Sequence, residues 1–179
     1  MLAYVFWHWP TAETDRARYL DAQRAFHRAL AADPSPGLRG SRVREVRGAP
    51  WVPAAEAFED WYLVDDFAAL GALNDAAVAG SRRAPHDGVA RLAAGGAGGL
   101  YRQLASGPPG PVSRVTWLSK PAGMGYPDFL ALLPRGVELW QRQLVLGPAP
   151  EFCLSQATAP PGLEGLTLAV QEVVPYQGC

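Results

Sequence analysis

The segment that decides the fold is Ala3-Tyr4-Val5-Phe6-Trp7-His8-Trp9, which Pro10 follows. β-Branched and aromatic residues dominate it, so we predict a strand over residues 3–9 that ends at the proline. Successive side chains of a strand point to opposite faces, and here both faces are apolar. A strand of this kind has to be covered on both sides. We therefore expect it to lie centrally in a sheet that is buried on two faces.

The rest of the first half alternates between helical and extended patterns. Tyr19, Phe26 and Leu30 recur at helical spacing, and Pro34 ends the helix that they predict. The stretch from Gly95 to Gly99 has no phosphate-binding spacing and is interpreted as a flexible loop. The expected elements after the first strand are a helix over 11–33, strands over 39–47 and 60–65, a helix over 67–78, a short helix over 87–94 and a strand over 100–104.

A Pro/Gly-rich segment at 106–112 reads as a linker, and the pattern of the first half restarts after it. The glycine pairs Gly37/Gly48 and Gly136/Gly147 have the same separation and bracket corresponding predicted strands. A proline-rich stretch replaces the second helix of this half. The expected elements are strands over 114–120, 137–146, 152–156 and 166–174 and a helix over 127–133.

These patterns predict an α+β fold built from tandem ferredoxin-like repeats, a β-α-β-β-α-β unit followed by a helix-poor second copy. Helices on one face of the first sheet leave its other face bare, and the second copy would cover that face. The predicted division is 1–105 for the first half, 106–112 for the linker and 113–179 for the second half, packed as one globular unit.

Composition narrows the function classes. The 179 residues are 49% hydrophobic and 18% charged with a net charge of −1, which suits a globular core and favours neither nucleic acid nor a membrane surface as partner. Arg is abundant against the single Lys120, as in proteins from GC-rich bacterial genomes. Cys153 and Cys179 are expected to be free thiols. Without a membrane span or a signal sequence, we expect a cytoplasmic protein.

Several short motifs of the first half resemble a known family. They are Phe26-His27-Arg28-Ala29-Leu30, Pro36-Gly37-Leu38-Arg39-Gly40, Trp61-Tyr62-Leu63 and Asp66-Phe67-Ala68-Ala69-Leu70. Together with the element order, they resemble the dimeric α/β-barrel superfamily, and within it the EthD-like and antibiotic-biosynthesis-monooxygenase-like groups. The resemblance implies antiparallel sheets packed as an α/β barrel, with a small-molecule cleft in the first half. The chain lacks the His-rich helix of the haem-degrading and quinol-oxidising branches, so we expect no cofactor and no metal.

The candidate catalytic residues are His27, on the flank of the first helix, and His8, on the first strand. Either could move a proton near neutral pH. Tyr4, Phe6 and Trp61 could line an aromatic pocket, and Arg42 and Arg44 share a strand face from which they could hold an anionic oxygen. Each feature has a structural alternative: a satisfied core histidine, an aromatic core, or a polar seam between the two halves.

Two functions stay open, and the sequence does not decide whether the protein is an enzyme. The first is a cofactor-independent enzyme that transfers a proton or oxygenates an aromatic or polyketide-like compound. The second is a non-catalytic ligand-binding or assembly protein of the same fold. For both functions, we expect a small molecule as the ligand and neither nucleic acid nor a membrane as a partner. We also expect a pseudo-dimer within the chain, which is compatible with a homodimer of two chains.

Overall fold

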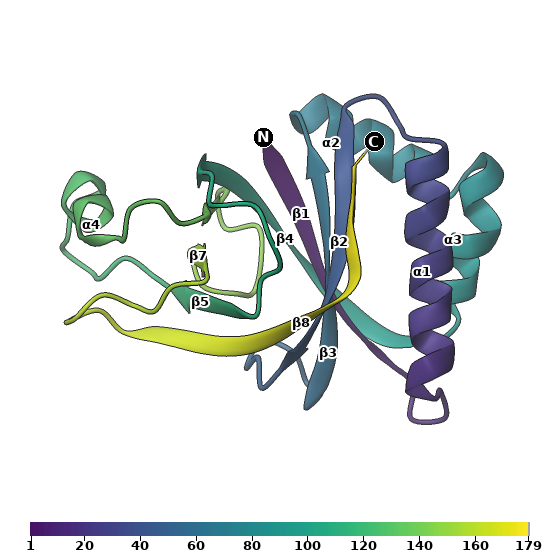
Figure 1. Ribbon diagram of the computed structural model, residues 1–179, viewed down its shortest axis with the longest axis horizontal. Helices are drawn as coiled ribbons and strands as arrows, with labels where there is room; N and C mark the ends of the chain where they lie inside the picture. Colours follow the sequence, from purple (N-terminus) through teal and green to yellow (C-terminus); the bar gives the residue numbers. More distant parts are fainter. Residues whose placement is uncertain (179) are drawn as a thin grey trace.

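The computed structural model describes residues 1–178, so Cys179 lies outside the described residues. Its strands form a closed antiparallel barrel with helices on the outside (Figure 1). This confirms the predicted α+β class and the barrel. The elements are β1 (Leu2–Pro10), α1 (Arg16–Ala32), β2 (Leu38–Arg47), β3 (Glu56–Val64), α2 (Phe67–Ala77), the 3₁₀ turn η1 (Gly80–Arg82), α3 (Arg83–Ala90), β4 (Ala93–Ala105), β5 (Arg114–Leu118), α4 (Tyr126–Leu132), β6 (Leu139–Arg142), β7 (Phe152–Ser155) and β8 (Gly165–Gly178).

The strand order around the barrel is β1-β3-β2-β8-β5-β7-β6-β4. The first half contributes four neighbouring strands in the order β4-β1-β3-β2, and the second half contributes β8-β5-β7-β6. The β2–β8 and β4–β6 ladders join the two halves, and the predicted linker lies between β4 and β5. No helix within residues 1–178 has the length and apolar character needed to cross a membrane.

Both faces of β1 are buried, as its sequence predicts. Val5 and Trp7 point into the barrel, where they pack with Trp61, Trp117 and other apolar side chains. Leu2 points the other way and packs with residues of α1 and α2. In Figure 1, α1 and α3 lie beside the first four strands, whereas α4 lies at the far end over the second half. Helical cover is therefore concentrated on one side of the barrel, and the space for a site lies there.

The prediction of a flexible loop over Gly95–Gly99 is wrong, because these residues belong to β4. They pair antiparallel with β1, so that Gly98 lies opposite Phe6 and Gly96 lies opposite His8. A Cβ atom at Gly96 would overlap the ring of Phe6, and one at Gly98 would overlap Tyr4. Rings from β1 thus occupy the space that side chains of β4 would fill, which stabilises a strand of low intrinsic propensity.

Three smaller expectations also differ from the structure. The first helix begins at Arg16 because Asp15 caps it, its side chain accepting a hydrogen bond from the Arg18 N–H. The short helix expected over 87–94 is α3, which begins earlier. The strand expected over 137–146 is only β6, because Leu144 has a φ of 52°, a left-handed conformation that a strand does not contain.

Gly96→Ala is expected to destabilise the protein by about 1–3 kcal/mol, since the added methyl group overpacks against Phe6 and lies 3.1 Å from the Trp7 carbonyl oxygen. Urea denaturation followed by far-UV circular dichroism measures the effect. Gly71→Ala is the matched control: this position in α2 has open space around it, so we expect a gain of about 0.5–1 kcal/mol. Equal effects at the two positions would contradict the proposed contact.

Candidate functional site

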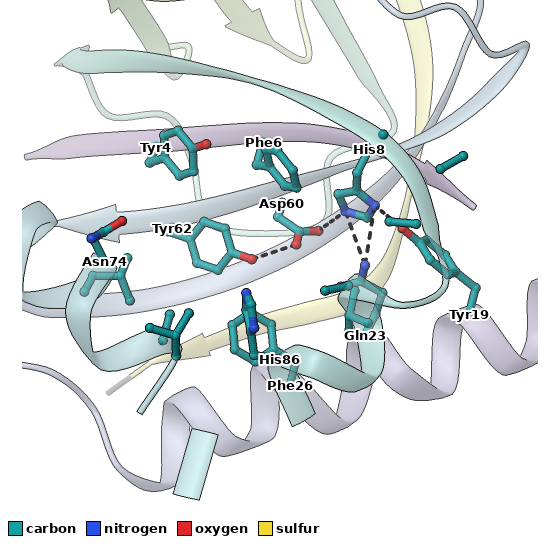
Figure 2. Close-up of a pocket in the computed structure, with 18 of the residues that line it drawn as sticks. Tyr4, Phe6, His8, Tyr19, Gln23, Phe26, Asp60, Tyr62, Asn74 and His86 are labelled. Atoms are coloured by element: carbon teal, nitrogen blue, oxygen red, sulfur yellow. Dashed lines mark hydrogen bonds and ion pairs between the residues drawn. The ribbon is translucent and has the colours of Figure 1, made fainter. Parts of the chain in front are cut away.

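A cavity of about 670 Å³ lies between the helix-facing side of the sheet and the helices α1, α2 and α3. Figure 2 shows its lining, in which aromatic rings from β1, β3 and α1 surround a polar end. The aromatic lining residues are Tyr4, Phe6, Tyr19, Phe26 and Tyr62. Among the described residues that line the cavity there is no Lys or Arg. The volume and the apolar walls suit a small organic ligand.

Small residues of β4 leave room for this cavity. Ala93, Ala94 and Gly95 lie along its wall, where larger side chains would fill the space. The outer boundary is α3, of which His86 and Val89 line the cavity while none of its residues is fully buried. Leu70 and Leu73 of α2 complete the apolar part. The glycine-rich segment therefore contributes to the site through the side chains that it lacks.

Asp60 is the charged centre of the polar end. It lies on β3, is 2% exposed and accepts hydrogen bonds from Tyr62 Oη at 2.7 Å and His8 Nε2 at 2.9 Å (Figure 2). His27 Nε2 lies 3.4 Å from Asp60 Oδ2, the oxygen that also accepts from Tyr62. Burial alone would raise the pKa of Asp60, but the electrostatic interactions and hydrogen bonds of its carboxylate with His8 and His27 outweigh burial and hold that pKa well below its usual range. Asp60 is therefore an ionised carboxylate inside the protein.

His8 is held between Asp60 and Tyr19. Because the carboxylate can only accept, His8 Nε2 carries the hydrogen and donates it to Asp60. When the ring is neutral, His8 Nδ1 then carries a lone pair that accepts the hydroxyl hydrogen of Tyr19, 2.7 Å away. Burial and, to a smaller extent, the charge of Asp60 raise the pKa of Tyr19, so this phenol stays protonated at neutral pH. The result is a directed chain from Tyr19 through His8 to Asp60.

The structure brings three of the predicted site residues, His8, Tyr4 and Phe6, to the cavity, but His27 does not line it. His27 is fully buried behind Tyr62, on whose ring it stacks with centroids 5.4 Å apart. Its Nδ1 lies 2.7 Å from Ser41 Oγ. His27 thus has the position of a residue that orients Asp60 from behind, without access to a ligand.

Arg42, Arg44 and Trp61 lie on the opposite face of the sheet, inside the barrel. Both guanidinium groups lie 5.1 Å from the centre of a Trp61 ring. Arg44 Nη1 is 3.5 Å from Glu59, and Arg42 Nη2 is 3.3 Å from Glu138. These residues form a polar core, and the structure does not place them where they could hold a ligand in the cavity.

Sequence reasoning missed Asp60, Tyr19, Tyr62, Gln23 and Ser41 as members of the site. One signal was present: Asp60 and Tyr62 are two residues apart in the same predicted strand, which places both on one face. A buried acid on such a face needs partners, and the two histidines supply them. No cluster of three or more His, Cys, Asp or Glu side chains suited to a metal ion occurs within residues 1–178.

Comparison with known proteins gives the fold alone. No family model matches the chain, and no curated protein matches its sequence. Two solved structures are similar in fold, each described as a "putative monooxygenase". The one from Fusobacterium nucleatum has a TM-score of 0.65 and 8% identity, covering 99% of this chain and 94% of that one. The one from Lactobacillus acidophilus has a TM-score of 0.55 and 12% identity, covering 99% and 96%.

Proposed function

We propose that the protein is a small-molecule enzyme that needs no cofactor and transfers a proton at an aromatic or polyketide-like compound. The observation that carries this proposal is the pair of His8 and the ionised Asp60 at the polar end of an aromatic cavity. A histidine oriented by a buried carboxylate is an arrangement typical of general bases. The monooxygenase description of the two structural neighbours is compatible with a small-molecule enzyme.

The proton passes through Tyr19, because both ring nitrogens of His8 already have protein partners. The phenol oxygen takes the proton of the substrate while its own hydrogen moves to His8 Nδ1. The imidazolium that forms lies 2.9 Å from the Asp60 carboxylate, which stabilises the positive charge without taking the proton. The concerted transfer avoids a free tyrosinate, which the raised pKa of Tyr19 disfavours.

Removal of the proton leaves a carbanion, and we propose that dioxygen oxidises it in a second step. Addition of dioxygen to the carbanion, followed by loss of water, would convert a CH₂ group to a carbonyl: R₂CH₂ + O₂ → R₂C=O + H₂O, with carbon oxidised and dioxygen reduced.

We also propose that the barrel is a pseudo-dimer of tandem ferredoxin-like repeats of the EthD-like or antibiotic-biosynthesis-monooxygenase-like kind. The same strand order in its two halves supports this.

A second candidate is a non-catalytic binding protein of the same fold. The observation that favours it is that His8 is 1% exposed and that each of its ring nitrogens already has a hydrogen-bond partner within the protein. Such a histidine can serve to hold the cavity open and polar without turning over a ligand. The two candidates differ in one measurable property, which is whether the protein accelerates proton removal from a bound compound.

His8→Gln is expected to reduce the protein-catalysed exchange rate of an acidic C–H proton by about 10²–10⁴-fold, as for loss of a general base. A suitable probe is 6-hydroxy-2-tetralone, which joins an aromatic ring to a C–H group beside a carbonyl. Nuclear magnetic resonance follows its exchange in D₂O. Gln103→Met, on β4 and outside the cavity lining, is the control and should keep the wild-type rate. Binding of the probe without acceleration by the wild-type protein would favour the binding-protein candidate.

A further inference from the structure

At the polar end of the cavity, the side-chain hydrogen-bond donors of His8, Tyr19 and Tyr62 already bind acceptors within the protein. Tyr62 donates to Asp60, His8 Nε2–H donates to Asp60, and Tyr19 donates to His8. A phenol oxygen has one hydrogen and two lone pairs, so Tyr19 and Tyr62 keep acceptor capacity after these bonds are made. Both residues line the cavity. What they can offer a ligand is therefore an oxygen that accepts.

Gln23 adds a third acceptor. Its side-chain nitrogen lies 3.4 Å from His8 Nδ1 and 3.3 Å from His8 Nε2, which places it over the ring and away from either lone-pair direction. An N–H group over the ring is favourable, whereas an oxygen there would be repelled. The amide nitrogen also lowers the pKa of Tyr19, against the larger effect of burial. Gln23 Oε1 is left buried and without a partner, on a residue that lines the cavity.

The charge of the site also disfavours an anionic ligand. Asp60 lines the cavity as an anion, and no Lys or Arg among the described lining residues could balance a second negative charge. Two like charges in a poorly solvated space repel strongly. At the polar end of the cavity, an anionic ligand would also meet the acceptor oxygens of Gln23, Tyr19 and Tyr62, although it needs donors.

The walls of the cavity favour a flat ligand. The rings of Tyr4 and Phe6 are 6.1 Å apart with 18° between their planes, and those of Phe6 and His8 are 5.4 Å apart with 29°. Tyr62 continues the series, with its ring 21° from the plane of Tyr4. Nearly parallel rings along one side offer a surface on which another ring can stack in an offset arrangement.

We infer that the cavity binds an uncharged ring compound that donates an O–H or N–H hydrogen bond to Gln23, Tyr19 or Tyr62, and that it rejects anionic rings. This inference rests on the proposed function in that it names the substrate class of the same site. It replaces the sequence-based expectation of a ligand held through an anionic oxygen by Arg42 and Arg44, which face the barrel interior.

Three probes that share one ring system test the inference on the wild-type protein. 2-Naphthol is uncharged and carries a donor, 2-methoxynaphthalene lacks the donor, and 2-naphthoate is an anion at neutral pH. Isothermal titration calorimetry should show 2-naphthol binding about 3–10-fold more tightly than 2-methoxynaphthalene, as expected for one hydrogen bond. The naphthoate should bind at least about 10-fold more weakly than 2-naphthol. Preferred binding of the naphthoate, or no binding of any probe at millimolar concentration, would overturn the inference.

Gln23→Met identifies the acceptor, because it keeps the shape of the side chain and removes its oxygen. The preference for 2-naphthol over 2-methoxynaphthalene should fall by about 3-fold or more, while binding of 2-methoxynaphthalene stays. Gln103→Met on β4, outside the cavity lining, is the matched control. An unchanged preference in Gln23→Met would remove Gln23 from the inference. The predicted preference without any proton exchange would leave the inference intact and reject the enzyme proposal.

Discussion

Glu59→Ala is expected to lower the free energy of unfolding by about 3–5 kcal/mol, because it removes one partner of a fully buried ion pair. Glu59 lies inside the barrel, where it accepts hydrogen bonds from Trp7 Nε1 at 3.2 Å and Trp61 Nε1 at 3.0 Å. Its partner Arg44 is also fully buried, and burial followed by the charge of Arg42 already lowers the pKa of Arg44. Without Glu59, the Arg44 charge and two indole N–H groups lose their acceptor. Guanidinium denaturation measures the loss.

Glu56→Ala is the control for that experiment. Glu56 begins the same strand, but its ion pair with Arg47 is exposed on both sides, so its removal should cost at most about 0.5 kcal/mol. A similarly small cost for Glu59→Ala would show that water reaches the barrel interior. In that case Arg42 and Arg44 could serve a ligand after all, and the division between a structural interior and a functional outer cavity would have to be abandoned.

The fold was predictable to the extent that its signals are local. The apolar residues on both faces of β1 predict a strand that is covered on two sides, and the helical spacing of Tyr19, Phe26 and Leu30 identifies α1. The strand at Gly95–Gly99 could not be predicted in this way. Its stability comes from rings of β1, such as Phe6, that are remote in the sequence, whereas its own residues have low strand propensity.

The site was harder to predict because a shift of one residue in strand register exchanges the two faces of a sheet. The sequence places Arg42 and Arg44 on one face and Trp61 in a neighbouring strand, but it does not say which face the helices cover. The structure puts these three inside the barrel and puts Asp60 on the helix side. Aromatic residues alone would have suited either face. The buried acid became recognisable only when two histidines from α1 and β1 were found beside it.

Asp60→Asn is expected to lower both the rate of proton exchange and the stability of the protein. The loss of stability can be measured without a substrate. The amide offers one acceptor oxygen where His8 and Tyr62 use two, and it carries no negative charge to stabilise an imidazolium, so exchange of the tetralone proton should slow by about 10²–10⁴-fold. The variant should also be less stable at neutral pH, since the hydrogen bonds from His8 and Tyr62 to a charged acceptor are lost.

The pH dependence of stability assigns that loss to the charge of Asp60. The pKa of Asp60 is lower in the folded protein than its ordinary value of 3.8, so the unfolded chain takes up the proton first as the pH falls. Its contribution is complete above about pH 4 and is lost progressively below it. The stability difference between wild type and Asp60→Asn should therefore shrink as the pH is lowered from 4, while Glu45 and Glu138, whose pKa values are also lowered, affect both proteins alike. A wild type that instead gains stability relative to Asp60→Asn as the pH falls through 4 would mean that Asp60 is neutral in the folded protein. A protonated Asp60 would donate a hydrogen bond instead of only accepting them. Both the proton-transfer proposal and the expected rejection of anions would then lose their basis.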